Sequence, residues 1–474
     1  MYKNKLIQTY ISLNKGELRR LKKYIKSDFV NKNEEILAFF NFIDTRTTLN
    51  EQTVTKEKAH QFIFGNASYN DLKMRHLIWQ TGVIIESFII YDQSTNNEIL
   101  KNQLLSNFYS KKELYKYAEE TLNNNIHLIE QSTTKNAAYY LDLFKTNASL
   151  FDIAQRNIRS NQFNIEQIVH NSSVFAIIEA LKYGCLVKSI QKLNEFEIED
   201  FFINNIIDFL PNSKYIKNPM VKIYYNDYLL ITTEEEEAFL SLEQDLKKHQ
   251  QLFSKEEYIE VYANLLNYCV KRTNQNDEVY AKKAFQLYID GVKDGILLEK
   301  NEINRFVFTN IVTLGIKVKS YAVIEQFIVS YFKNIDEDYR QNTYDFNQAK
   351  LYFAKAEYDK ALQILLTNEF KDVLWNLNAK FIVLKIFFEQ AEYQSFVVYL
   401  KSFKVYIKRK NNIGYHATYF NSVAKSLTQL QKIQKQPNKY KSFSFDESTA
   451  DKAWFDNALQ LINQSLKKQK ATTT

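Results

Sequence analysis

The side chains that most often perform catalysis are scattered along this sequence. The six histidines lie at positions 60, 76, 127, 170, 249 and 416, and none is spaced from another like the paired metal ligands of one helix. The sequence also contains no glycine-rich phosphate loop, no G-x-S-x-G turn and no H-E-x-x-H pair. These observations favour a protein that is not an enzyme and that holds no cofactor or catalytic metal.

Acidic residues gather where helices are expected to begin. Asp336–Asp338 and Glu234–Glu237 each precede an apolar, periodic stretch, and carboxylates in a first helical turn complement the helix dipole. Thr233–Glu236 and Ser254–Glu257 also have the spacing of a capping box. We therefore interpret the acidic runs as helix N-termini; an acidic binding site is the alternative.

Positive charge is concentrated near the end of the sequence. Residues 401–474 contain 14 lysines and arginines against 4 aspartates and glutamates, with aromatic residues interleaved. Five of the cations form a basic patch: Lys401, Lys404, Lys408, Arg409 and Lys410. Such a patch neutralises phosphates, and aromatic rings stack on bases, so nucleic acid is one predicted partner. The alternative is a solvated face at a helix C-terminus.

Composition predicts the class of fold that carries these residues. The chain has 474 residues, 45% of them hydrophobic, but only 8 glycines and 3 prolines, too few for the tight turns of an all-β fold. Cys185 and Cys269 are far apart and predict buried free thiols in a reducing compartment. No stretch predicts a signal peptide or a membrane span, so we expect a cytoplasmic, all-α protein.

Helix signals divide the sequence into four predicted segments. They are an N-terminal helical cap domain at 1–92, degenerate helical repeats at 93–210, more regular repeats at 219–436 and a basic tail with a capping helix at 437–474. In the first segment Asn33 is a predicted N-cap, and a long helix is predicted to start at Asn70 or Asp71 and to run through Tyr91. In the third segment, the first helices of successive pairs are predicted to begin near residues 219, 255, 301, 339, 375 and 412.

One short motif occurs twice at the spacing of a helix-turn-helix repeat. Ala356-Glu357-Tyr358 recurs 35 residues later as Ala391-Glu392-Tyr393, each time between two apolar, periodic stretches. These residues resemble tetratricopeptide repeats, in which small and aromatic side chains pack two antiparallel helices together. Ala349 and Tyr352 also fit that pattern. The opening residues 13–40 are similar to the start of uncharacterised bacterial helical-repeat proteins.

The resemblance implies a right-handed superhelical solenoid of antiparallel helix pairs, preceded by the small N-terminal cap. Such repeats bind extended peptides along a concave side formed by the first helix of each pair. In this register the partner groove comprises two sets with the same residue types: Phe346, Lys350, Phe353 and Phe381, Lys385, Phe388. A Phe-Lys-Phe face suits a partner with apolar side chains and a carboxylate, although the same spacing also fits an ordinary buried stripe. The resemblance thus implies a non-enzymatic scaffold for a protein or peptide; a nucleic-acid-associated regulator that uses the basic ends is the alternative.

Overall fold

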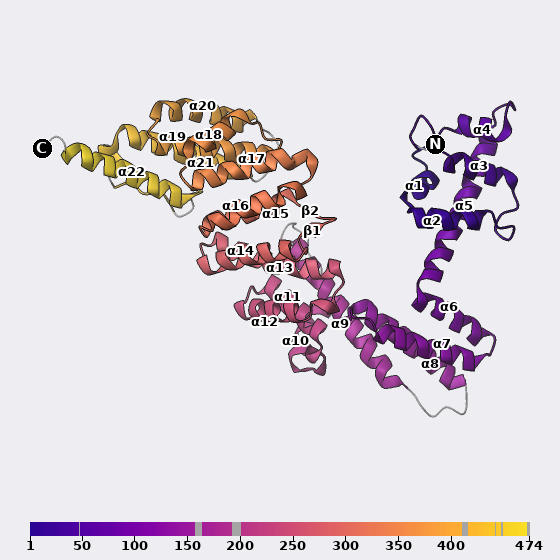
Figure 1. Cartoon of the computed structure of the whole chain (residues 1–474). Helices are drawn as coiled ribbons and strands as arrows, with labels where there is room; N and C mark the ends of the chain where they lie inside the picture. The colour runs from indigo at the N-terminus through magenta and orange to yellow at the C-terminus, as the bar shows by residue number, and fades with distance from the viewer. Residues whose placement is uncertain are drawn as a thin grey trace. The chain divides into compact units, whose positions relative to one another are not determined.

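Helices account for almost all of the regular structure (Figure 1). The computed structural model describes residues 1–46, 48–156, 164–191, 201–409, 416–440, 442–446 and 449–471, with the backbone alone for residues 201 and 465–471. Within these ranges there are 22 α-helices, five short 3-10 helices and one two-stranded hairpin. The predicted all-α class is confirmed. None of the helices in the described ranges has both the length and the apolar character needed to span a lipid bilayer.

The chain forms two compact units, Met1–Ala180 with Phe202–Val221, and Leu181–Phe201 with Lys222–Thr474. The helices that begin in the first unit are α1 (Lys5–Ser12), α2 (Lys15–Ile25), α3 (Glu34–Asp44), α4 (Lys56–Phe64), α5 (Asp71–Asn96), α6 (Glu98–Lys111), α7 (Tyr115–Glu130), α8 (Ala137–Arg156), α9 (Ile165–Gln191), η1 (Leu210–Asn212), η2 (Lys214–Lys217) and α11 (Pro219–Thr232). The helix α10 (Phe201–Phe209) begins at the junction. The finer division into four segments stays a prediction.

The N-terminal helices α1 to α5 bury a common apolar core. Phe39, Phe42 and Phe88 are fully or almost fully buried in it. The side chains of Asn33 and Asn70 accept backbone hydrogen bonds at the starts of α3 and α5. The predicted N-cap Asn33 is confirmed, and the long helix predicted to start at Asn70 or Asp71 begins at Asp71 with Asn70 as its N-cap. Next along the chain, α6, α7 and α8 pack in sequence order.

The second unit continues with further helices in pairs. They are α12 (Glu236–Lys248), η3 (Gln250–Leu252), α13 (Lys255–Asn274), α14 (Glu278–Lys293), α15 (Arg305–Lys317), α16 (Tyr321–Tyr331), η4 (Phe332–Asn334), α17 (Glu337–Ala354), α18 (Tyr358–Thr367), α19 (Val373–Glu389), α20 (Tyr393–Arg409), α21 (His416–Lys435), η5 (Pro437–Tyr440) and α22 (Lys452–Ala471). The strands β1 (Leu298–Glu299) and β2 (Glu302–Ile303) form the hairpin between α14 and α15.

The same short turn joins six helix pairs, which are α6–α7, α11–α12, α13–α14, α15–α16, α17–α18 and α19–α20. In each, the second residue after the first helix has a positive φ and the next helix begins two residues later; these residues are Glu113, Glu234, Asn276, Lys319, Ala356 and Ala391. In five of the six, all except α11–α12, the next backbone N–H donates back to a carbonyl in the last turn of the first helix. This left-handed ending satisfies carbonyls that the helix leaves unpaired. The recurrence shows a helical-repeat-like organisation in the described chain.

This turn explains where sequence-based helix boundaries succeeded and where one failed. The first helices α11, α13, α15, α17 and α19 begin within four residues of the predicted positions, and the capping box at Ser254 and Glu257 is confirmed. The start predicted near residue 412 lies outside the described residues. The capping box predicted at Thr233 is wrong. Thr233 lies inside the turn, where its hydroxyl donates to the Leu229 carbonyl, and Glu235 is the N-cap of α12.

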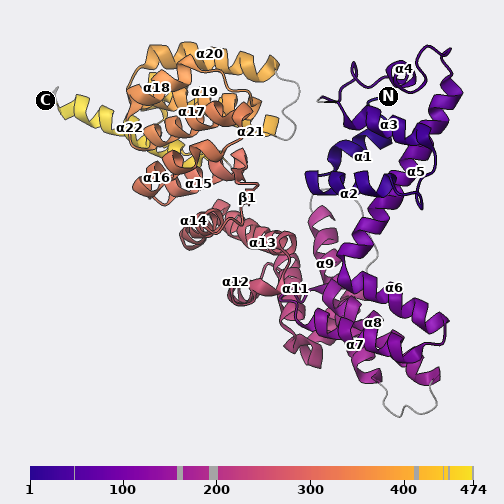
Figure 2. The same cartoon turned by 45° about the vertical axis from the view of Figure 1, so that its right-hand side comes forward.

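Successive pairs also contact one another, and α15, α17 and α19 do so as first helices. The helix α17 packs on both α15 and α19, and α20 and α22 both pack on α21. Figures 1 and 2 show α15 to α22 gathered at the C-terminal end of the second unit. Both predicted free cysteines are confirmed as buried.

Candidate functional site

The first predicted groove set lies on α17 and is partly covered by neighbouring helices. Phe346 is buried, and its ring stacks on Trp375 with ring centres 5.1 Å apart. Phe353 is half-buried and contacts the Tyr358 ring. The two phenylalanines therefore contribute mainly to packing.

Lys350 is the charged member of this set. Its side chain is half-buried, with the amino group 5.5 Å from the centre of the Phe346 ring and within hydrogen-bond distance of the exposed Thr313 hydroxyl on α15. Burial lowers the pKa of Lys350 from 10.5 to about 8. In the part of the chain that the structure describes, no carboxylate forms an ion pair with it. Lys350 is thus a desolvated cation without a counter-charge.

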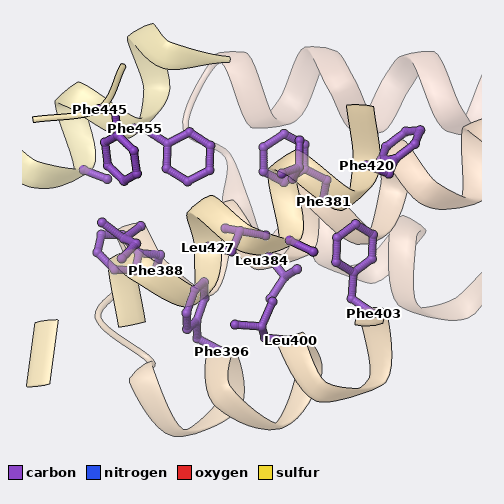
Figure 3. Close-up of a cluster of buried hydrophobic side chains, with 14 of the residues drawn as sticks. Phe381, Leu384, Phe388, Phe396, Leu400, Phe403, Phe420, Leu427, Phe445 and Phe455 are labelled. Atoms are coloured by element: carbon purple, nitrogen blue, oxygen red, sulfur yellow. The ribbon is translucent and has the colours of Figure 1, made fainter. Parts of the chain in front are cut away.

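The second predicted set lies on α19 and is occupied by the start of α22. Lys385 pairs with the Asp451 carboxylate, and its amino group lies 4.4 Å from the centre of the Phe381 ring and 5.3 Å from that of Trp454. Phe381 and Phe388 are both almost fully buried. Figure 3 shows them beside the segment that carries Phe455.

Aromatic contacts and one further hydrogen bond hold this C-terminal segment on α19. The Trp454 ring centre is 6.0 Å from that of Phe381 and 6.0 Å from that of Phe388. The Trp454 indole N–H donates to Oε1 of Glu389 at 2.6 Å. Phe455 is fully buried against the Phe381 and Phe445 rings. A carboxylate followed by two aromatic rings therefore covers the Phe-Lys-Phe face.

The two predicted groove sets have the same residue types at the same spacing but different surroundings in the structure. Lys350 and Lys385 occupy equivalent positions 35 residues apart, but only Lys385 has an acidic partner among the described residues. Asp451 and Trp454 were not predicted to contribute. The sequence feature that could have identified them is a carboxylate, Asp451, three residues before the aromatic pair Trp454-Phe455. A partner for the Phe-Lys-Phe face is expected to carry the same groups.

The described members of the predicted basic patch all lie on α20. Lys401 and Arg409 are exposed on α20, whereas Lys404 and Lys408 line a cavity. Lys410 lies outside the described residues. The cavity was not predicted, because it needs lysines from a second helix.

That cavity has a volume of about 740 Å³ and lies between α20, α21 and the segment before α22. Lys404 and Lys408 contribute from α20, and Lys425 and Lys432 contribute from α21. We call the space that these four lysines line the lysine cavity. Burial lowers the pKa of Lys404, and the nearby positive charges of Lys432 and Lys408 lower it further.

The second unit also buries one acidic side chain that sequence reasoning missed. Asp227 on α11 is almost fully buried, and the Asn264 amide donates to both carboxylate oxygens at 3.0 Å. Burial raises the pKa of Asp227 to about 7, an effect opposed by hydrogen bonds from Asn264 and the Cys185 thiol.

Among the side chains that the structure describes, no cluster of histidine, cysteine, aspartate and glutamate could hold a metal ion. Comparison of the chain with family models, curated proteins and solved structures gave no match. The class defined by the observations above is an all-helical protein with repeat-like helix pairs.

Proposed function

We propose that this protein is a non-enzymatic helical-repeat scaffold that binds a protein or peptide partner at the Lys350 face, formed by Lys350, Phe353 and Thr313 on α17 and α15. The helix pairs stack as a tetratricopeptide-like right-handed superhelix in this proposal, with α13, α15, α17 and α19 lining its concave side. The recurring turn and the packing of α17 on α15 and α19 support the arrangement. The buried free thiols agree with a reducing, cytoplasmic location.

The observation that supports this proposal is the packing of the segment at the start of α22 on α19. This segment places a carboxylate on the lysine of the Phe-Lys-Phe face and aromatic rings beside it. Lys350 has the same position in the preceding repeat and has no carboxylate partner among the described residues. We therefore infer that the partner presents an acidic residue followed closely by an aromatic one.

Replacing Lys350 with methionine is expected to weaken binding of such a segment roughly ten- to a hundredfold, because a hydrogen bond to a charged group contributes about 1.5–3 kcal/mol. The probe is a fluorescent synthetic peptide with the sequence of residues 449–462, and fluorescence anisotropy gives the dissociation constant. Lys333→Met, at an exposed lysine in η4, is the matched control. Equal binding by wild type and Lys350→Met would contradict the role of this face.

The same interaction should depend on pH. With a pKa of about 8, the Lys350 amino group is mostly protonated at pH 7, and a bound carboxylate raises that pKa. Affinity for the peptide should be fully present well below pH 8 and should fall as the pH rises through the raised pKa of the complex. Anisotropy titrations between pH 6.5 and pH 10 measure this. Lys350→Met should show no such loss, and a flat profile in the wild type would count against an ammonium–carboxylate contact.

A nucleic-acid-associated regulator is the second candidate, and the four lysines of the lysine cavity favour it. Titration with duplex and single-stranded oligonucleotides at two salt concentrations tests it. Absence of binding at low salt would remove this candidate.

A further inference from the structure

The lysine cavity brings positive charge together around a partly open space between two helices. Four lysines line it, against a single described carboxylate, that of Asp446. Lys404 and Lys408 are one helical turn apart on α20, and Lys425 and Lys432 are two turns apart on α21, so each pair lies on one side of its helix. The two neighbouring helices therefore line one cavity with four lysines, of which Lys404 is half-buried and the other three are exposed.

These lysines differ from several other cations of the same unit. Lys271, Lys283 and Lys385 each form an ion pair with a carboxylate. Across the described residues, no ion pair involves any lysine of the cavity. Lys404 is half-buried, and the positive charges of Lys408 and Lys432 add to its desolvation. Repulsion of this kind is relieved when an anion binds between the ammonium groups.

The walls of the cavity are fixed by the hydrophobic core. Ile407, Ala424 and Phe445 line it and are buried members of the cluster that also contains Phe455 (Figure 3). Hydroxyl groups of Ser422 and Ser426 line the same space and supply hydrogen-bond donors for phosphate oxygens. The alternative, a solvated lysine face on one helix, would lack both the buried core residues beneath the lysines and the hydroxyls from a second helix.

We propose that the lysine cavity binds a small ligand that carries two or more phosphate groups. Lysine ammonium groups act as point charges for phosphate, and four of them exceed what a single phosphate would neutralise. A volume of about 740 Å³ fits a small molecule, whereas a polymer would need a basic track along the surface. The site lies on α20 and α21 and is independent of the Lys350 face.

The test is isothermal titration calorimetry of the full chain with inorganic tripolyphosphate, in low salt and in 150 mM salt. Lys404→Gln/Lys432→Gln should weaken binding at least tenfold. The control, Lys401→Gln/Lys435→Gln, removes the same charge from the same two helices outside the cavity and should change the dissociation constant less than twofold. Circular dichroism should show both double variants folded, with the cavity variant melting at the same or a higher temperature than wild type.

Several outcomes would overturn the proposal. They are no binding of tripolyphosphate by wild type in low salt, an equal loss in the control variant, and equally tight binding of inorganic phosphate. A single-stranded oligonucleotide that binds more tightly than tripolyphosphate, with the same dependence on Lys404 and Lys432, would assign the site to nucleic acid instead. Competition by ATP and by inositol hexakisphosphate distinguishes a nucleotide from a sugar polyphosphate, and displacement by either supports the proposal.

Discussion

Asp227→Asn is expected to stabilise the protein at pH 8 by up to about 4 kcal/mol, the free energy that corresponds to raising a carboxyl pKa from 3.8 to about 7. The cause is burial: the ionised carboxylate of Asp227 has lost its hydration, and the Asn264 amide and the Cys185 thiol replace only part of it. An asparagine keeps an acceptor for Asn264 and carries no charge.

The sign of the pH dependence follows from the direction of this shift. Between pH 4 and pH 7 the unfolded chain releases the Asp227 proton while the folded chain retains it, so the free energy of unfolding falls as the pH rises. Urea denaturation at several pH values should show this decline in wild type and a flatter profile in Asp227→Asn. Asp359→Asn, at an exposed site on α18, should leave the decline unchanged. A wild-type profile that rises throughout this window in parallel with that of Asp227→Asn would contradict the burial argument.

Phe455→Ala is expected to destabilise the second unit by roughly 3–5 kcal/mol, because truncating a fully buried phenylalanine loses its transfer free energy and leaves a cavity. Phe455 contacts rings from α19 and from the segment before α22, as Figure 3 shows. Its loss should loosen α22 and separate Asp451 from Lys385.

Denaturant unfolding measures the global effect, and the rate of trypsin cleavage within α22 measures local detachment. Leu461→Ala is the matched control on the same helix, since Leu461 is 46% exposed and its truncation should change stability by less than about 0.5 kcal/mol. Equal losses in the two variants would show that α22 is not anchored through Phe455.

The local signals in the sequence predicted the helix pairs well, because each is set by neighbours along the chain. Asn33, Asn70 and Ser254 cap helices through residues two or three positions away, which sequence spacing reveals. The turn itself was harder to predict. Its left-handed residue is Ala356 or Ala391 in two pairs, where glycine is the usual signal, so only the repeated spacing marks it.

The candidate sites depended on contacts between distant segments, which the sequence pattern did not specify. Lys350 and Lys385 each lie between the same two phenylalanine positions, and their difference arises from Asp451, 66 residues after Lys385. Likewise, Lys404 was predicted as part of a patch on one helix, whereas the cavity also needs Lys432 from the next helix. Charge counting located the basic region but could not say which lysines converge.

The packing of α22 on α19 determines how many ligands the proposed scaffold binds at a given ligand concentration. A ligand with a carboxylate and an aromatic ring meets a vacant lysine at Lys350, but at Lys385 it must compete with a segment tethered to the same chain. The apparent dissociation constant at Lys385 is the intrinsic constant divided by the fraction of molecules whose α22 is detached. The ligand would therefore occupy the Lys350 face first and the Lys385 face second. The local stability of the C-terminal helix would set the ligand concentration at which the Lys385 face becomes occupied.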